Sequence, residues 1–175
     1  MKKNLKEKYK KIGILGGTFD PPHVGHLNIS KIAIKKLKLD KIIWLITKQN
    51  PLKKKPYLSI YLRKKLSKSL VKKQKKISIK YLDDKVKSKS TFDLLNFLLK
   101  RKSKIKLFFL MGADNLINFH KWKNWKKIPE LAKIVVFARP NYSTKALGSI
   151  AAKKLKKKDW IYLNYKKINI SSSLI

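Results

Sequence analysis

The 175-residue sequence predicts a single α/β domain built on a doubly wound, mostly parallel, Rossmann-like sheet. Strand-like and helix-like segments alternate along the whole chain. Several strand segments, such as IIWLI at 42–46, are nearly continuous apolar runs. Runs of this kind are typical of parallel strands whose two faces are both covered by helices. With 43% hydrophobic residues, a chain of this length can bury a proper core.

Each element follows from its local pattern. The strands are short apolar runs, predicted at residues 12–16, 41–47, 77–82, 105–111, 134–138 and 160–165. The helices repeat apolar residues every three or four positions and are predicted at 25–39, 58–73 and 91–100, with one or two short helices within 115–125. A basic helix is expected over 143–157, with the apolar stripe Leu147, Ile150, Ala151 and Leu155. Residues 1–10 are expected to be a basic extension and residues 11–175 the domain.

Charge is the unusual feature of the composition. The chain has 46 Lys and Arg against 9 Asp and Glu, a formal net charge of +37. Such a field attracts polyanions, so a basic nucleic-acid-binding protein is one alternative function. The lysines are spread along the whole chain, without a local patch of arginine and aromatic residues. This distribution favours a general compositional bias, and we expect no specific nucleic-acid partner.

The sequence contains no cysteine, which excludes disulfides and thiolate metal sites. No long apolar stretch follows the basic N-terminus, and no apolar run is long enough to span a bilayer. We therefore expect a cytoplasmic protein with no membrane partner. The pattern leaves its oligomeric state open.

In a doubly wound sheet, ligands bind beyond the carboxyl ends of the strands. The first such segment is GGTFDPPHVGH, in which Gly16 and Gly17 are expected to turn the backbone sharply and to admit a ligand closely. His23 and His26 open the next helix and face the same way, beside N–H groups that favour an anion. We expect a phosphate site. The alternatives are a loop with two incidental histidines or a chelating pair, but no carboxylate pair or cysteine completes a metal site.

This segment contains neither GxGxxG nor GxxxxGK[ST]. HVGH at 23–26 resembles the motif of the HxGH nucleotidyltransferase superfamily, and GGTFDPPHVGHL at 16–27 is similar to the longer motif of bacterial nicotinate-nucleotide adenylyltransferases. The resemblance implies that His23 and His26 hold the ATP phosphates and stabilise the transferred one. It places four further residues along the bound ATP: Gly16, Gly17, Thr18 and Phe19.

Two more segments continue the resemblance in the same order. NPLK at 50–53 is similar to the family's NPxK element and offers Lys53 as a mobile cation for the triphosphate. STFDLL at 90–95 resembles SYTxDTL, with a serine at position 90 in place of the aromatic residue. Thr91 is expected to cap the following helix and to contact the acceptor nucleotide.

MGADNLINFHKWKNW at 111–125 resembles the family's MGxDxLxxFxxWxxW region. The resemblance implies that Asp114 contacts a ribose and that Trp122 packs on the nicotinate ring, for which an indole offers a flat face. The alternative for Trp122 is a purely structural anchor, which is the role that we expect for Trp125. His120 is expected to lie at the surface.

FARP at 137–140 resembles the family's FxRP element and places Arg139 at the same rim, where an arginine among so many lysines suggests bidentate phosphate binding. Arg63 is expected to be structural. ISSSLI at 170–175 resembles ISSTxIR, which implies that Ser171, Ser172 and Ser173 bind the ATP phosphates. The family continues with an arginine, so either the sequence is truncated or another cation, such as Lys53, takes that place.

The resemblance implies an enzyme of NAD biosynthesis. It would transfer AMP from ATP to nicotinate mononucleotide, giving deamido-NAD and pyrophosphate, with Mg²⁺ carried on the ATP. The alternative enzyme is a sister adenylyltransferase acting on nicotinamide mononucleotide or phosphopantetheine. The alternative from another class is the nucleic-acid-binding protein that the charge allows.

Overall fold

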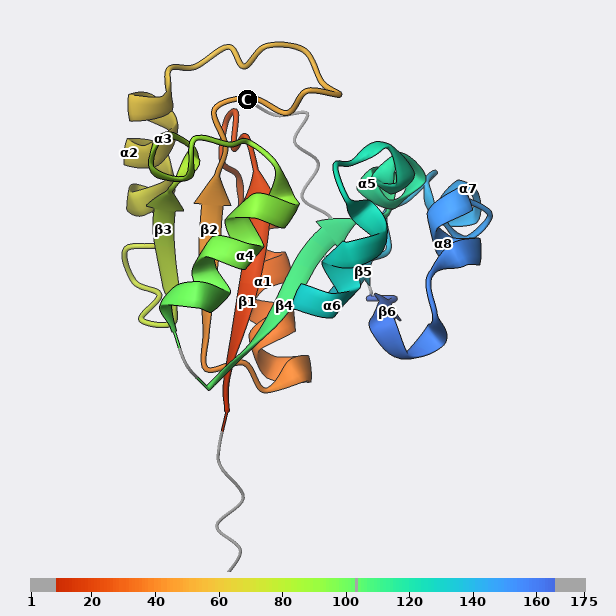
Figure 1. The fold of residues 1–175 in the computed structure, drawn as a ribbon. Coiled ribbons are helices and arrows are strands. Elements are labelled where there is room, and N and C mark those ends of the chain that lie inside the picture. The colour runs from red at the N-terminus through yellow and green to blue at the C-terminus, as the bar shows by residue number, and fades with distance from the viewer. Residues whose placement is uncertain (1–8, 103, 166–175) are drawn as a thin grey trace, which may run out of the picture.

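Six parallel strands form one sheet in the computed structural model, which describes residues 9–102 and 104–165 (Figure 1). The strand order is β3-β2-β1-β4-β5-β6, and every neighbouring pair is parallel. The strands are β1 (Lys10–Gly17), β2 (Lys41–Ile46), β3 (Ile77–Tyr81), β4 (Ile105–Gly112), β5 (Ala132–Phe137) and β6 (Trp160–Leu163). The predicted fold class is confirmed, because each expected strand is present at its expected place and the sheet is Rossmann-like.

Helices cover both faces of this sheet. Helix α1 (Val24–Leu37) lies behind the sheet in the view of Figure 1, whereas α4 (Thr91–Arg101) and α6 (Ile128–Leu131) cross in front of it. The remaining helices are α2 (Ile60–Leu70), α3 (Asp83–Val86), α5 (Ala113–Ile117), α7 (Ser143–Leu147), α8 (Ile150–Lys154) and three 3₁₀ turns at Phe119–Lys121, Trp125–Lys127 and Lys157–Asp159. In the described part of the chain, no helix combines the length and the apolar character needed to cross a membrane.

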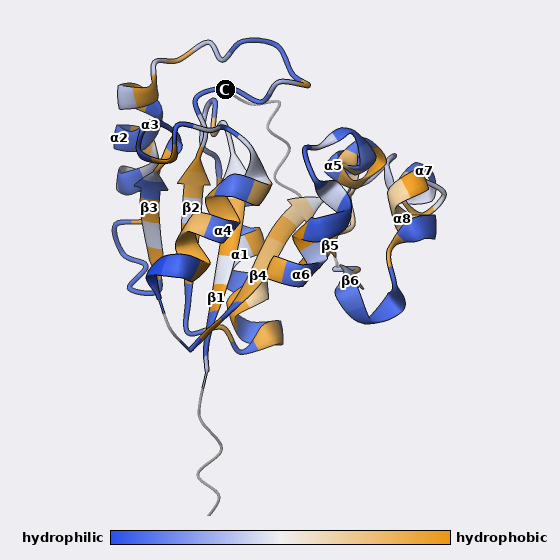
Figure 2. Cartoon of the chain, in the orientation of Figure 1, coloured by the Kyte–Doolittle hydropathy of each residue, from blue (hydrophilic) through white to orange (hydrophobic). Residues whose placement is uncertain are grey.

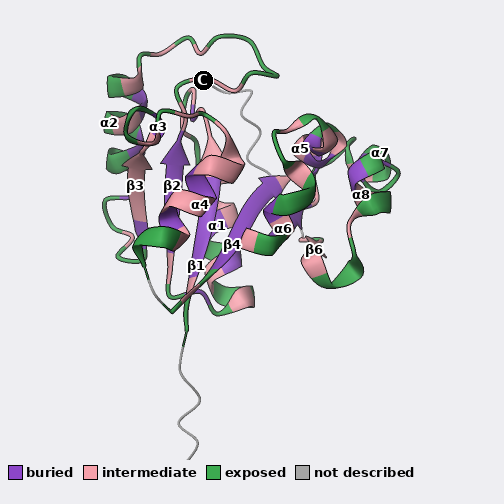
Figure 3. Ribbon diagram, viewed as in Figure 1, coloured by how far each residue is buried: buried purple, intermediate pink, exposed green. Residues whose placement is uncertain are grey.

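Alternate residues of the central strands enter two separate apolar cores. On β4, Phe109 and Met111 pack with the core under α4 and α6, while Phe108 and Leu110 pack with the core under α1 and α2. The central strands are therefore apolar along their length and buried (Figures 2 and 3). Burial on both faces is the reason that the sequence shows continuous apolar runs and no alternation.

The prediction of a single basic helix over 143–157 is wrong. Helix α7 ends at Leu147, and a new helix, α8, begins after Ser149, whose hydroxyl accepts a hydrogen bond from the N–H of Ala152 (3.2 Å). Serine is a favourable N-cap, so it starts a second helix here and does not continue the first. In the predicted stripe Leu147 and Ile150 are about half exposed (49% and 53%), whereas Ala151 is buried.

The strand order reverses at β1. Strands β2 and β3 follow on one side of β1, and β4, β5 and β6 follow on the other. The helices that leave β1 and β4 therefore lie on opposite faces of the sheet, which opens a crevice between the carboxyl ends of these two strands. In sheets of this type that crevice is the ligand-binding position.

Candidate functional site

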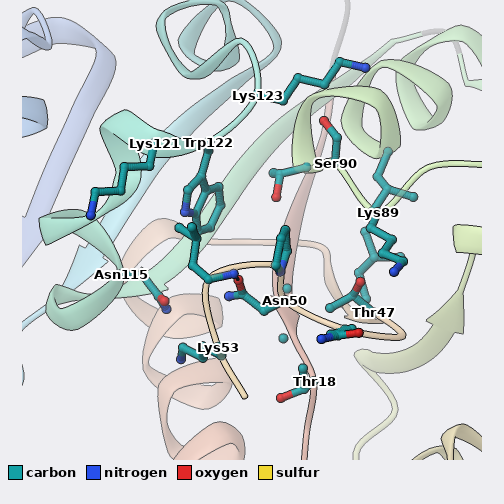
Figure 4. A pocket seen from close by; sticks show the side chains of 18 of the residues that line it. Thr18, Thr47, Asn50, Lys53, Lys89, Ser90, Asn115, Lys121, Trp122 and Lys123 are labelled. Carbon is teal, nitrogen blue, oxygen red and sulfur yellow. Dashed lines mark hydrogen bonds between the residues drawn. The ribbon is translucent and has the colours of Figure 1, made fainter. Parts of the chain in front are cut away.

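A cleft of about 370 Å³ opens at this crevice, beyond the carboxyl ends of β1, β2 and β4 (Figure 4). Six of the predicted site residues line it: Gly16, Gly17, Thr18, Lys53, Thr91 and Trp122. In Figure 4, Thr18 and Lys53 lie at one end, while Trp122 and Ser90 lie at the other. The cleft thus joins segments that are more than a hundred residues apart in the sequence.

The prediction of a sharp turn at Gly16 and Gly17 is wrong. Both glycines belong to β1 and pair regularly with Leu45 and Ile46 of β2, and no described glycine has a positive φ. The residue in the left-handed region is Phe19 (φ 52°), which is followed by a cis peptide bond between Asp20 and Pro21. The glycines still line the cleft, so their missing side chains leave room for a ligand.

His23 and His26 form a capping box at the start of α1. The Nδ1 atom of His23 accepts from the N–H of Gly25 (3.1 Å), and the Nδ1 atom of His26 accepts from the N–H of His23 (3.2 Å). The two ring centroids are 3.9 Å apart, so the imidazoles face the same way, as the spacing predicts. A Cβ atom at position 25 would lie 2.8 Å from the His23 ring, so a larger residue there would displace the ring. Because Nδ1 accepts in both rings, the neutral tautomer leaves Nε2–H as the donor of each.

Partial desolvation and nearby positive charges keep both imidazoles neutral, although His23 is exposed and His26 is only partly buried. The pKa of His26 is lowered to about 3. Desolvation of the ring is the largest cause, and the charge of the neighbouring His23 is the second. Burial and the positive charge of Arg139 lower the pKa of His23 as well. The ring of His26 packs against Phe19 at 4.7 Å and Trp44 at 5.8 Å between centroids. At neutral pH the pair therefore presents two uncharged N–H donors beside a helix N-terminus.

Phe19 is placed differently from its predicted role along ATP. Its side chain is 2% exposed and stacks on Trp44, with ring centroids 5.0 Å apart. Trp44 in turn donates its Nε1–H to Ser30 Oγ (2.8 Å), which donates to the carbonyl of His26 (2.9 Å). The Phe19 side chain therefore supports His26 from the core side and does not line the cleft.

Arg63 joins the loops that flank the cleft, as its predicted structural role requires. Its guanidinium is buried and donates to the carbonyls of Thr18 (2.6 Å), Thr47 (2.8 Å), Lys48 (3.1 Å) and Leu58 (3.1 Å). These carbonyls follow β1, follow β2 and precede α2. One side chain therefore holds the two strand ends that form the floor of the cleft.

Asp114, Arg139 and Lys53 meet at the rim, although the sequence separates them widely. Arg139 Nη1 lies 2.9 Å from Asp114 Oδ2, and Lys53 Nζ lies 3.9 Å from the same oxygen. Asp114 is 17% exposed at its side chain, while the two cations are about half exposed. A Cβ atom at position 112 would lie 2.5 Å from Asp114 Oδ1, so Gly112 leaves the space that this carboxylate occupies. The loop that carries Lys53 thus reaches the end of β4.

Trp122 closes the other end of the cleft. Its ring packs edge-on against Phe109 of β4 (5.9 Å between centroids) and Phe119 (5.2 Å). The ring is only partly buried and lines the cleft, so packing and a ligand contact are compatible. Trp125 also packs edge-on against Phe119 at 5.9 Å, in agreement with its expected structural role.

Two expectations near this end are wrong. The N-cap of α4 is Ser90, whose hydroxyl accepts from the N–H of Asp93 (3.4 Å), and Thr91 is the first helical residue. The serine that replaces the family's aromatic residue has thus taken over the cap, which leaves Thr91 to line the cleft. His120 is partly buried, with its Nδ1 atom covered, because the short turn it belongs to packs into the core.

The predicted site omits several cleft residues, although Asn50 belongs to the NPLK segment and Asn115 to the 111–125 segment. Thr47, Asn50, Asn115 and three lysines, Lys89, Lys121 and Lys123, also line the cleft. Lys89 directly precedes Ser90, and Lys121 and Lys123 flank Trp122, but the number of lysines elsewhere in the chain hides these positions. The predicted serines Ser171, Ser172 and Ser173 lie outside the described residues.

Comparison with known proteins agrees with this architecture. The family model described as "Cytidylyltransferase-like" matches residues 14–175. A protein of Pelagibacter ubique named "Probable nicotinate-nucleotide adenylyltransferase" is 49% identical over 170 residues, which cover 97% of this chain and 94% of that protein. A protein of Ruegeria sp. with the same name is 39% identical over 142 residues, covering 81% of this chain and 75% of that protein.

The fold is also found among solved structures. Nicotinic acid mononucleotide adenylyltransferase of Plasmodium falciparum, complexed with NaAD, superposes with a TM-score of 0.72 at 18% identity, over 91% of this chain and 77% of that one. The family model covers nearly the whole described domain, and the bacterial relatives align over most of their own length. The chain therefore belongs to the cytidylyltransferase-like family of nucleotidyltransferases, within the group of bacterial nicotinate-nucleotide adenylyltransferases.

Proposed function

We propose that this enzyme transfers the adenylyl group of ATP to nicotinate mononucleotide, giving deamido-NAD and pyrophosphate in NAD biosynthesis. The observation that carries the proposal is a single cleft with two chemically different ends. Lys53 lines one end, and the neutral imidazoles of His23 and His26 lie outside the lining, with His26 within electrostatic reach of Lys53 and Arg139. Cations and imidazole donors near a helix N-terminus suit phosphates. The other end has the face of an indole, which suits a planar pyridine ring. The names of the bacterial relatives support the same substrates.

The reaction needs positioning and charge stabilisation and no protein nucleophile. A 5′-phosphate oxygen of the mononucleotide attacks the α-phosphorus of ATP, and the bond from that phosphorus to the bridging oxygen breaks in line, releasing pyrophosphate. His26 and His23 donate Nε2–H bonds to the α-phosphate as negative charge develops there. A neutral donor held by packing needs no reorganisation during this step.

The cations at the rim bind the remaining phosphates. We assign Lys53 to the triphosphate and Arg139 to the phosphate of the mononucleotide. Both cations pair with Asp114 in the structure without ligand, and Asp114 is the acceptor that we assign to ribose hydroxyls. We assign Thr91 to the acceptor nucleotide and Trp122 to its ring, and Gly16, Gly17 and Thr18 to the ATP side, together with Ser171, Ser172 and Ser173.

Magnesium enters as part of the substrate MgATP. The described residues contain no group of three His, Asp or Glu side chains that could hold a metal ion, and the carboxylate of Asp114 is already paired with Arg139. This donor set fits an ion that the nucleotide phosphates coordinate, whose charge offsets that of the leaving pyrophosphate.

Pyrophosphate release tests the proposal. MgATP is supplied with nicotinate mononucleotide, nicotinamide mononucleotide or phosphopantetheine in parallel reactions. We expect a clear preference for nicotinate mononucleotide. Release with another acceptor would retain the adenylyl transfer and reject the substrate, whereas release with none would reject the enzyme function.

A matched variant separates catalysis from polyanion binding. His23→Asn keeps a side-chain oxygen that can cap α1 but removes the imidazole. We expect it to lower turnover by about a hundredfold or more, the usual cost of one such donor. Retention on immobilised RNA should be unchanged, and a parallel loss of both properties would favour the nucleic-acid-binding alternative.

A further inference from the structure

The end of the cleft that holds Trp122 is called the acceptor end below. Its two walls come from distant parts of the chain. One wall is the N-terminus of α4, with Ser90 and Thr91, and the other is the loop that carries Trp122. Lys123 joins them: its Nζ atom lies 2.9 Å from Oδ2 of Asp93, in the first turn of α4. In Figure 4 the Lys123 side chain runs along the top of the cleft toward the helix that carries Ser90.

Asp93 is held in place for this contact. Ser88 donates its hydroxyl to the same Oδ2 atom at 2.7 Å, and the N–H of Asp93 donates to Ser90 Oγ. The Ser88 hydroxyl, followed by Lys123, lowers the pKa of Asp93, so the carboxylate is charged at neutral pH. A carboxylate that accepts from Ser88, on a residue whose N–H is bonded to Ser90, can define where the lysine, and the loop behind it, comes to rest.

The loop has few other polar ties to that wall. The Trp122 ring packs against Phe109 and Phe119, in the apolar core that also contains Leu94 and Leu95 of α4. Within residues 9–102 and 104–165, no other hydrogen bond or ion pair links the 118–124 loop to α4. Lys121, on the other side of Trp122, lines the cleft without an acidic partner in the same ranges.

We propose that the Asp93–Lys123 ion pair sets the separation between Trp122 and the N-terminus of α4, and thereby positions the pyridine ring of the acceptor. The inference rests on the proposed function. Asp93 and Lys123 are positioning residues, acting through Trp122 and Thr91 and not by touching the substrate. Since the charges are partly exposed, with side chains 26% and 62% accessible, each variant should have a moderate effect.

A second role for Lys123 makes the opposite prediction. If Lys123 simply attracted the anionic acceptor, removing its partner would free the ammonium and tighten acceptor binding. If the pair positions the two walls, removing either partner loosens acceptor binding. Asp93→Asn therefore distinguishes the two roles by the sign of the change, because the amide keeps the shape and the Ser88 contact while losing the charge.

The experiment is steady-state pyrophosphate release by the full chain, varying nicotinate mononucleotide and MgATP separately. Asp93→Asn and Lys123→Met should each raise KM for the mononucleotide about two- to fivefold, the range of one partly exposed ion pair. KM for the mononucleotide in the double variant should not exceed the larger of the two single-variant values, because the second change removes nothing further. We expect kcat and KM for ATP to be unchanged. Lys126→Met, with the same change on a lysine outside the cleft, should match the wild type.

Three results would overturn the inference: a lower KM in Asp93→Asn, no change in either single variant, or additive effects in the double variant. Partial unfolding would lower the apparent kcat and leave both KM values unchanged. Thermal unfolding and the comparison of KM with kcat therefore separate it from lost positioning. A wild-type enzyme that is inactive with nicotinate mononucleotide overturns the proposed function together with this inference, and that result is read before any variant is made.

Discussion

The partly buried imidazole of His26 makes a prediction about stability that is independent of catalysis. Its pKa of about 3 in the folded protein lies below the ordinary value of 6.5, chiefly because the ring is desolvated where it packs against Phe19 and Trp44. Between these two pH values the unfolded chain binds a proton that the folded chain does not. Acidification through this window therefore lowers the free energy of unfolding, and raising the pH restores it.

The magnitude follows from the size of the window. At pH 5 the unfolded imidazole is about 1.5 pH units below its ordinary pKa, and each unit corresponds to about 1.4 kcal/mol, so His26 contributes a loss of about 2 kcal/mol relative to pH 7. His26→Gln is the matched variant. It removes the titrating ring, while glutamine is the usual partner at this position of a capping box and can still accept from the N–H of His23.

Urea unfolding followed by far-ultraviolet circular dichroism at pH 7 and pH 5 measures the difference. We expect the wild type to lose about 2 kcal/mol more than His26→Gln between these two pH values, whatever the variant costs at pH 7. All other titrating groups are common to both proteins, so their contributions cancel in the comparison. Equal pH dependence in the two proteins would refute the assignment of a neutral, desolvated His26.

Three further predictions concern single side chains. Arg63→Lys should lower the free energy of unfolding by about 3 kcal/mol or more in urea titration, because one ammonium cannot serve four carbonyls; a loss below about 1 kcal/mol would contradict the bracing role. Trp44→Phe should cost about 2 kcal/mol in the same assay, from the lost bond to Ser30 and the space left in the core. Trp122→Ala should raise KM for nicotinate mononucleotide about tenfold while Trp122→Phe raises it less, as expected for a stacked ring; a larger effect on KM for ATP would place the ring of the acceptor elsewhere.

Local pattern alone predicts much of this protein. The strand positions follow from the apolar runs, because a strand buried on both faces has no room for polar residues. The pairing of His23 with His26 also follows from the sequence, since a spacing of three at a helix start determines which way both rings face. These features depend on residues within one turn of each other.

Local pattern is less reliable where two local structures compete. Gly16 and Gly17 have the freedom to turn, but both remain in the strand because their backbone groups complete the ladder with β2. The turn falls at Phe19, where burial of the ring against Trp44 holds a left-handed backbone. The break at Ser149 and the cap at Ser90 are of the same kind, because either serine is acceptable within a helix until packing selects the boundary.

The sequence by itself determined the strand–helix alternation, which follows from residue type and short spacing, while the resemblance to a known family indicated which segments belong to the cleft. Only the tertiary structure decided which distant side chains meet. Asp114 contacts Arg139 and Lys53, and Lys123 contacts Asp93, because the strand order brings the ends of β1, β2 and β4 and the start of α4 to one edge. Each of these contacts depends on distances across the sheet, and in a chain with 46 cations no local pattern distinguishes a lysine that pairs from one that faces solvent.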